Sequence, residues 1–208
     1  MLEDRDYTII IDKSGSMSAK DQQGGKSRWE MMQESTLALA RKCEQFDPDG
    51  ITVYTFSNRF KRYDNVTTTK IAQIFKESEP IGNTRLAEVL QDALNIYFQR
   101  KASGKTKQNG ETILVVTDGE ADDRKAVMKV IIEASWQMER DEELAISFIQ
   151  IGNDLEATGF LKRLDDELKS KDKSDGGAKF DIVDTITIDD IENEQLTLKE
   201  VLLNAIID

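Results

Sequence analysis

The sequence predicts a doubly wound α/β fold, in which helices cover both faces of a mostly parallel sheet. Three observations support this prediction. Short runs of β-branched and apolar residues alternate with segments of helical periodicity, and the runs are too short to form helices. The chain has 208 residues, 38% of them apolar, which suits one domain at about 150 residues per domain. We therefore expect residues 1–208 to form a single Rossmann-like three-layer sandwich with one short antiparallel edge strand.

The first half of the chain supplies three of the expected strands. Residues 7–11 and 51–56 are β-branched runs typical of strands buried on both faces, whereas 59–66 alternates only weakly and suits an edge. Apolar residues recur at helical spacing over 29–46 and 86–97. The expected elements are, in order, a strand over 7–11, a helix over 29–46, a strand over 51–56, an edge strand over 59–66, a short helix over 69–76 and a helix over 86–97.

The second half continues the alternation after a polar linker. The run Thr-Ile-Leu-Val-Val at 112–116 is the clearest candidate for a central strand. Gly176-Gly177 lies in a charged stretch that we expect to be a surface loop. The expected elements are a strand over 112–116, a helix over 126–136, a strand over 144–151, a helix over 155–168, a loop over 169–179, a strand over 180–188 and a helix over 197–207.

Two residue counts narrow the chemistry. The chain has no histidine, which excludes a histidine general base, a Ser-His-Asp or Cys-His triad and histidine-ligated zinc. Its single cysteine, Cys43, lies on the apolar face of a predicted helix and cannot form an intramolecular disulfide. A bound metal would therefore have oxygen ligands, which favours Mg²⁺, Mn²⁺ or Ca²⁺.

The charge balance bears on partners and location. A formal charge of −12 disfavours bulk binding to nucleic acid or to an anionic membrane. No segment approaches the ~18 apolar residues of a membrane-spanning helix, and the N-terminus lacks the features of a signal peptide. These features predict a soluble protein of the cytoplasm.

Oxygen-bearing side chains follow two expected strands and precede one helix. Asp12, Ser14 and Ser16 come directly after the first strand, Asp118 follows the 112–116 strand, and Thr84 precedes the helix over 86–97. Ligands of doubly wound sheets bind beyond the carboxyl ends of the strands, so we expect these loops to share one rim. A divalent cation would offset the repulsion between the two carboxylates, about 4 kcal/mol at 4 Å and an effective dielectric of 20.

These residues give the sequence a resemblance to the von Willebrand factor A domain family. Asp12-Lys-Ser14-Gly-Ser16 matches the family's Asp-x-Ser-x-Ser motif, Gly82-Asn-Thr84 its threonine loop, and Thr117-Asp118-Gly119 its late aspartate. The resemblance covers nearly the whole chain and implies a complete metal-ion-dependent adhesion site. It implies that Ser14 and Ser16 bind the metal directly, that Thr84 and Asp118 bind it directly or through water, and that Asp12 mainly holds waters.

The resemblance also implies a function, which is non-enzymatic binding of a partner protein. An Asp or Glu carboxylate of that partner completes the coordination of Mg²⁺, Mn²⁺ or Ca²⁺. Cytosolic bacterial relatives often act beside AAA+ ATPases or in stress- and metal-resistance assemblies, so such partners are expected. We expect the ligand rim to include Lys13, Met17, Arg85 and Gly119.

Basic residues near this rim are expected to steer an acidic partner. The loop over 13–28 carries Lys13, Lys20, Lys26 and Arg28 against Asp21, and this local excess opposes the overall negative charge. Lys13 and Lys26 are also compatible with plain solvated charges.

Other interpretations of the same residues are weaker. Asp12 or Asp118 alone is compatible with a helix cap or a turn. Gly25-Lys26-Ser27 lacks the earlier glycine of a phosphate-binding loop, because position 20 is lysine. Residues 172–177 resemble the start of a calcium loop, but position 183 is valine where the closing glutamate should be. No Gly-x-Gly-x-x-Gly motif supports dinucleotide binding.

The alternative function is a Mg²⁺-dependent phosphatase or phosphotransferase with Asp12 as the nucleophile. Phosphatases of the haloacid dehalogenase type carry a second aspartate two residues after the nucleophile. This chain has Ser14 there, so the general acid is missing.

Overall fold

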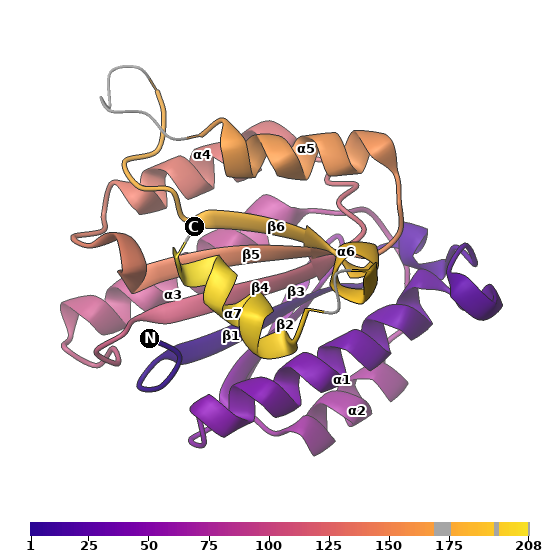
Figure 1. The fold of residues 1–208 in the computed structure, drawn as a ribbon, viewed down its shortest axis with the longest axis horizontal. Helices are drawn as coiled ribbons and strands as arrows, with labels where there is room; N and C mark the ends of the chain where they lie inside the picture. Colours follow the sequence, from indigo (N-terminus) through magenta and orange to yellow (C-terminus); the bar gives the residue numbers. More distant parts are fainter. Residues whose placement is uncertain (169–175, 194–195, 208) are drawn as a thin grey trace.

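The computed structural model describes residues 1–168, 176–193 and 196–207, and it places a six-stranded sheet between two layers of helices (Figure 1). The strand order is β3-β2-β1-β4-β5-β6. Neighbouring strands are parallel except β2 and β3, so β3 is the antiparallel edge strand that the sequence predicts. The strands are β1 (Asp6–Asp12), β2 (Ile51–Phe56), β3 (Phe60–Val66), β4 (Glu111–Thr117), β5 (Leu144–Gln150) and β6 (Val183–Thr187).

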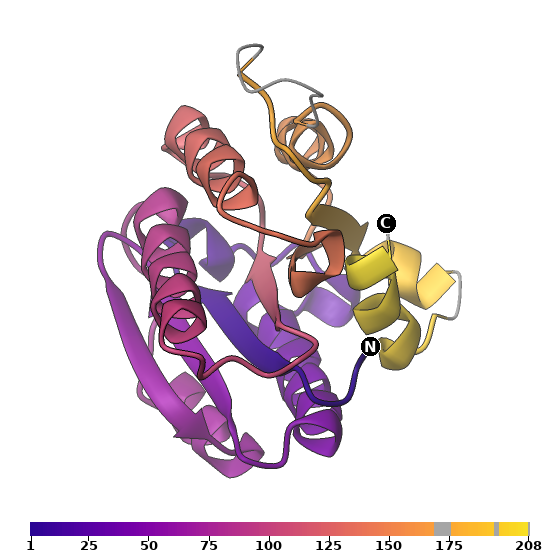
Figure 2. The same ribbon diagram turned by 90° about the vertical axis from the view of Figure 1, so that its left-hand side faces the viewer.

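The helices divide between the two faces of this sheet (Figure 2). Buried residues of α3, α4 and α5 share one apolar cluster with the sheet, and those of α1, α2 and α7 share the other. The expected doubly wound α/β sandwich is confirmed. The helices are α1 (Arg28–Phe46), α2 (Thr68–Lys76), α3 (Leu86–Ala102), α4 (Arg124–Ser135), α5 (Leu155–Asp166), α6 (Ile188–Asn193) and α7 (Leu198–Ile207).

The central strands are apolar on both sides because each faces a helical layer. In β1, Ile10 packs into the cluster with α3 to α5, whereas Ile9 and Ile11 pack into the cluster with α1, α2 and α7. The same alternation holds in β4 for Val115 and Val116. Alternation of side chains along a strand buried on both faces explains the continuous apolar runs in the sequence.

A capping box fixes the start of α1. The Glu30 backbone N–H donates to Ser27 Oγ at 3.1 Å, and the Ser27 backbone N–H donates to Glu30 Oε2 at 2.7 Å. Two of the backbone donors left unpaired at the start of the helix are thereby satisfied. The first helical residue, Arg28, is held at a defined point above the carboxyl ends of the strands.

The structure differs from the sequence prediction in the last strand and in the loop after β1. β6 begins at Val183 rather than at 180 and ends at Thr187, where α6 begins instead of a continued strand. Thr187 caps α6, because its Oγ accepts the Asp190 N–H at 3.0 Å. The loop after β1 contains short 3₁₀ turns at Gly15–Ser18 and Gln23–Gly25. Residues 172–175 of the candidate calcium loop and residues 169–175 of the expected 169–179 loop lie outside the described residues.

No helix in the described part of the chain is both long enough and apolar enough to cross a bilayer.

Candidate functional site

The candidate site lies where the strand order reverses, between β1 and β4. The chain leaves β1 toward β2 on one side and leaves β4 toward β5 on the other. Ile11 pairs with Val116, so Asp12 and Thr117 end neighbouring strands at the same level. Such a switch point opens a crevice at the carboxyl ends of the strands, and the predicted oxygen-bearing residues begin there.

The first loop brings two serine hydroxyls together beside a buried carboxylate. Ser14 Oγ lies 3.1 Å from Ser16 Oγ, and the Ser14 backbone N–H donates to Asp12 Oδ1 at 2.8 Å. Asp12 is fully buried and Ser14 is buried. Ser14, which precedes the turn at Gly15–Ser18, and Ser16 within it therefore bring their hydroxyls together next to Asp12.

Thr117, which the sequence analysis did not single out as a site residue, holds the other oxygen of Asp12. Thr117 Oγ1 donates to Asp12 Oδ2 at 2.6 Å and accepts the Gly119 backbone N–H at 3.0 Å. Both Thr117 and Asp118 are buried. A polar residue that ends an otherwise apolar strand was the signal in the sequence that could have identified Thr117.

Backbone hydrogen bonds tie the threonine loop to the first loop. The Gly15 N–H donates to the Gly82 carbonyl at 2.9 Å, and the Ile81 N–H donates to the Lys13 carbonyl at 2.8 Å. Because of these two bonds, the segment that leads to Thr84 runs alongside the loop that carries Ser14.

Two further aspartates, Asp122 and Asp123, tie Thr84 to the loop after β4. The Thr84 N–H donates to Asp122 Oδ2 at 2.7 Å, and the Asp122 N–H donates to the Thr84 carbonyl at 3.1 Å. The Asp123 carboxylate accepts the N–H groups of Leu86 and Ala87, the first residues of α3. The sequence analysis missed both aspartates, although their closeness to Asp118 in the sequence was a usable signal. The three predicted loops thus meet at one rim.

Arg28 forms an ion pair with Asp118, the second carboxylate of the site. Its Nη1 donates to Asp118 Oδ2 at 3.0 Å and to Glu120 Oε1 at 2.9 Å, and its Nη2 donates to Asp21 at 2.8 Å. Burial alone would lower the pKa of Arg28, but the bonds to Asp21, Glu120 and Asp118 raise it above its ordinary value. The guanidinium is therefore a permanent cation.

The two carboxylates of the site influence each other. Burial raises the pKa of Asp12 to about 7, and the negative charge of Asp118 adds to this rise. The hydrogen bonds from Thr117 and Ser14 act in the opposite direction, because they stabilise the ionised carboxylate. A cation beside Asp12 would stabilise the same charged form.

The chemistry of these donors fits a hard divalent cation. Adjacent ligands of an octahedral ion at 2.0–2.1 Å lie about 2.9 Å apart, close to the 3.1 Å between the serine hydroxyls. Across the described residues, no group of three or more His, Cys, Asp or Glu side chains is arranged to hold a metal. The candidate set differs from such groups because three of its five members, Ser14, Ser16 and Thr84, are hydroxyls.

The four residues expected at the ligand rim have different positions. Lys13 is half-buried and Arg85 is exposed. Gly119 is buried, in the turn after Asp118. Met17 was wrongly placed at the rim, because its side chain is fully buried in the apolar cluster with α1.

The expected steering charge is smaller than the sequence indicated. Arg28 is buried against three carboxylates, and Lys26 pairs with Glu34 at 2.7 Å. Arg85 pairs with Glu88 at 3.1 Å on the exposed surface. Within the described residues, no carboxylate lies within 4.0 Å of the Lys13 or Lys20 ammonium group, and their steering role remains a prediction.

Comparisons with known proteins give one family and one fold. The sequence model of the von Willebrand factor type A domain matches residues 7–120, which include all five candidate metal ligands. No curated protein matches the chain significantly.

Two solved structures resemble the chain over 95% of its length. The D319A mutant of the PilB minor pilin from Streptococcus sanguinis has a TM-score of 0.64 at 13% identity, and this chain spans 60% of its length. The manganese-loaded TRAP protein of Plasmodium vivax has a TM-score of 0.58 at 14% identity, with 72% of that chain covered. At these identities the likeness extends to the fold alone.

Proposed function

The chain belongs to the von Willebrand factor type A domain family, and from this premise we propose that it is a metal-dependent protein-binding module. Domains of this family are generally adhesion or protein-interaction modules. In the proposal, Asp12, Ser14, Ser16, Thr84 and Asp118 hold Mg²⁺, Mn²⁺ or Ca²⁺. The bound cation supplies an open coordination position for an Asp or Glu carboxylate of a partner protein.

The observation that carries this proposal is the pair of serine hydroxyls beside two buried aspartates. Ser14 Oγ and Ser16 Oγ lie 3.1 Å apart, and hydrogen bonds hold Asp12 and Asp118 in place. Neutral hydroxyls offset less of a cation's charge than carboxylates do, so an incoming carboxylate gains more. The manganese carried by the TRAP protein of similar fold supports a metal in this proposal.

The described residues and the comparisons give no support to the phosphatase alternative. Asp12, its required nucleophile, is fully buried and accepts hydrogen bonds on both carboxylate oxygens. Position 14 carries a serine where a general acid would be needed. The proposal therefore contains no catalytic step.

The cytoplasmic location is part of the proposal, supported by the single, buried cysteine Cys43. A partner from an AAA+ ATPase or from a stress- or metal-resistance assembly remains a prediction that rests on the sequence resemblance.

Titration of metal into the purified chain tests the proposed ligands. We expect Mn²⁺, measured by the loss of the free-ion electron paramagnetic resonance signal, to bind the unaltered protein at one site. Mg²⁺ should compete for it, and either metal should raise the melting temperature by mass action. Ser14→Ala should weaken binding by at least about tenfold, because a ligand is lost. Ser18→Ala is the matched control, since Ser18 lies in the same turn and its hydroxyl donates only to the Gly15 carbonyl.

Capture of partners from native lysate, with Mg²⁺ or with chelator, tests the second half of the proposal. Captured proteins should be released by chelator and should be absent with Ser14→Ala. Equal Mn²⁺ affinity in the Ser14→Ala and Ser18→Ala variants would contradict the metal site. Capture that is unaffected by chelator would contradict the metal bridge.

A further inference from the structure

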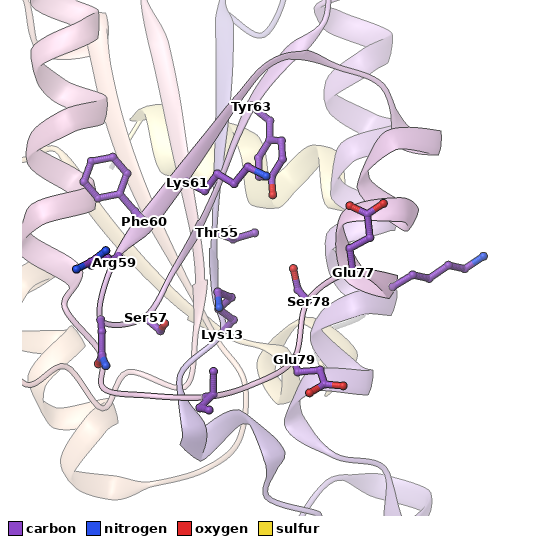
Figure 3. Close-up of a pocket in the computed structure, with 13 residues that line it drawn as sticks. Lys13, Thr55, Ser57, Arg59, Phe60, Lys61, Tyr63, Glu77, Ser78 and Glu79 are labelled. Atoms are coloured by element: carbon purple, nitrogen blue, oxygen red, sulfur yellow. The ribbon is translucent and has the colours of Figure 1, made fainter.

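An open groove of about 750 Å³ lies beside the candidate metal site (Figure 3). It separates β2 and β3 from the segment that follows α2. Its volume is in the range of ligand-binding clefts. Its lining includes Lys13, Ser57, Lys61, Tyr63 and Ile81.

The groove and the candidate site share a wall. Lys13 lines the groove and directly precedes Ser14. The Ile81 N–H donates to the Lys13 carbonyl at 2.8 Å, and the Arg85 N–H donates to the Ser57 carbonyl at 3.2 Å. A chain bound at the metal site can therefore continue into the groove without leaving the surface.

The sheet side of the groove is basic. Lys13 and Lys61 lie on this side, and Lys61 Nζ stands 4.7 Å from the centre of the Tyr63 ring. Neither lysine has a carboxylate within 4.0 Å among the residues that the structure describes. By contrast, Arg62 on the same strand pairs with Asp64 at 3.1 Å.

The other charged groups of the groove lie at its margins. Glu77 and Glu79 are on the α2 side, and Glu77 accepts a hydrogen bond from Gln73. Arg59 lies at the end of the β2–β3 turn, with its side chain directed away from the centre of the groove (Figure 3). Lys76 is exposed at the end of α2. The four basic residues outnumber the two acidic ones, although the whole chain carries −12.

We propose that this groove binds an acidic segment of the partner protein, continuous with the residue that supplies the coordinating carboxylate. This inference rests on the proposed function and specifies the ligand of the same site. Carboxylates of the segment would pair with Lys13 and Lys61, and an apolar residue would contact Tyr63 or Ile81, which is 68% exposed. Alternate side chains of an extended segment point the same way, so the acidic residues should recur at every second position from the coordinating acid.

Fluorescence anisotropy with labelled 12-residue Gly/Ser peptides tests this proposal. One peptide carries a single central glutamate, and the other carries three glutamates at alternate positions. In Mg²⁺ we expect the three-glutamate peptide to bind the unaltered protein about fivefold more tightly, as two partly exposed ion pairs would give. Lys13→Gln/Lys61→Gln should make the two peptides bind with equal affinity. The measure is the ratio of the two affinities within each variant, because Lys13 is also an expected rim residue and its loss should weaken both peptides alike. The matched control is Lys125→Gln/Lys129→Gln, two exposed lysines on α4, on the opposite face of the sheet.

The outcomes separate this proposal from the metal-bridge proposal. The acidic-segment proposal would be overturned if the three-glutamate peptide had the same advantage in the groove and control variants, or had no advantage in any protein. Binding of the single-glutamate peptide would still report on the metal. If neither chelator nor Ser14→Ala weakens the binding of the two peptides, the metal bridge is overturned. The tighter binding of the three-glutamate peptide, and its dependence on the lysines, would still be measurable. A 12-nucleotide single strand that binds through the same lysines more tightly than the three-glutamate peptide would overturn the choice of a protein ligand. Failure of both peptides to bind at 1 mM would refute both proposals.

Discussion

Arg28 Nη1 lies 3.0 Å from Asp118 Oδ2, so a guanidinium from the start of α1 neutralises the aspartate that follows β4. The two residues are 90 positions apart in the sequence. The same guanidinium also pairs with Asp21 and Glu120. The negative charge of Asp118 is therefore compensated before any metal binds. A divalent cation at the site would share this carboxylate with Arg28.

Replacement of Arg28 should have opposite effects on the metal-free and metal-bound protein. Arg28→Gln leaves the buried Asp118 carboxylate unpaired, which should cost about 3 kcal/mol of stability in chelator. The freed charge should attract a divalent cation more strongly, so the rise in melting temperature with Mg²⁺ should exceed that of the unaltered protein. Differential scanning calorimetry measures both effects. A metal-induced rise equal to or smaller than that of the unaltered protein would show that Arg28 does not oppose metal binding.

Thr117 should act as a positioning residue for Asp12. Thr117→Val keeps the side-chain shape but removes the hydrogen bond to Asp12 Oδ2, so Mn²⁺ affinity at neutral pH should fall about tenfold. Mn²⁺ binding is lost at low pH as Asp12 is protonated, and the pH of half-maximal binding should move upward, because the ionised carboxylate loses a hydrogen-bond donor. Thr52→Val, near the start of β2, is the control. Unchanged affinity and an unchanged pH profile would rule out the positioning role.

The contribution of Asp12 to the stability of the metal-free protein should fall as the pH rises from about 4 to about 7. The pKa of Asp12 is raised to about 7 in the folded protein, so the native state holds a proton that the unfolded chain releases near pH 4. The stabilisation by that proton is complete at low pH and is lost as Asp12 ionises. The loss should be on the order of 2–4 kcal/mol, and Asp12→Asn should remove it. Urea unfolding at several pH values in metal-free buffer measures the slope, and equal slopes in both proteins would contradict the assignment.

Gly110 should tolerate no side chain. It has a φ of 79°, and a Cβ at this position would lie 1.8 Å from the Glu143 carbonyl oxygen. Gly110→Ala should therefore destabilise the protein by more than about 3 kcal/mol or prevent folding. Gly104→Ala is the control, because Gly104 has a similar φ of 67° with no atom within 4 Å of its added Cβ. Its cost should be only the ~1 kcal/mol of the backbone conformation. Equal urea midpoints for the two variants would contradict the steric argument.

Local sequence patterns were sufficient to predict the fold. The errors in that prediction occurred where local patterns are ambiguous. Strands buried on both faces leave continuous apolar runs, so β1, β2 and β4 were visible in the sequence. The β-branched run that ends at Ile188 favours a strand throughout, yet Thr187 caps a helix there because Asp190 pairs with it. A capping contact of this kind competes with strand propensity and is hard to detect from the run alone.

Within the candidate site, the motif identified the residue types, whereas the supporting contacts depend on the tertiary structure. The spacing of Asp12, Ser14 and Ser16 is local, so it could be recognised in the sequence. Arg28 was counted among the steering charges, because its partner Asp118 comes near only after the sheet forms. Met17 had the appearance of a rim residue, because only the 3₁₀ turn directs its side chain into the core.

The basic and acidic residues of β3 have a consequence for self-association. An open sheet edge offers unpaired backbone groups to any other chain. β3 carries Lys61, Arg62 and Asp64 in succession around Tyr63, so docking the edge strands of two copies would remove several charged side chains from water. The charges on β3 should therefore discourage edge-to-edge pairing of two copies.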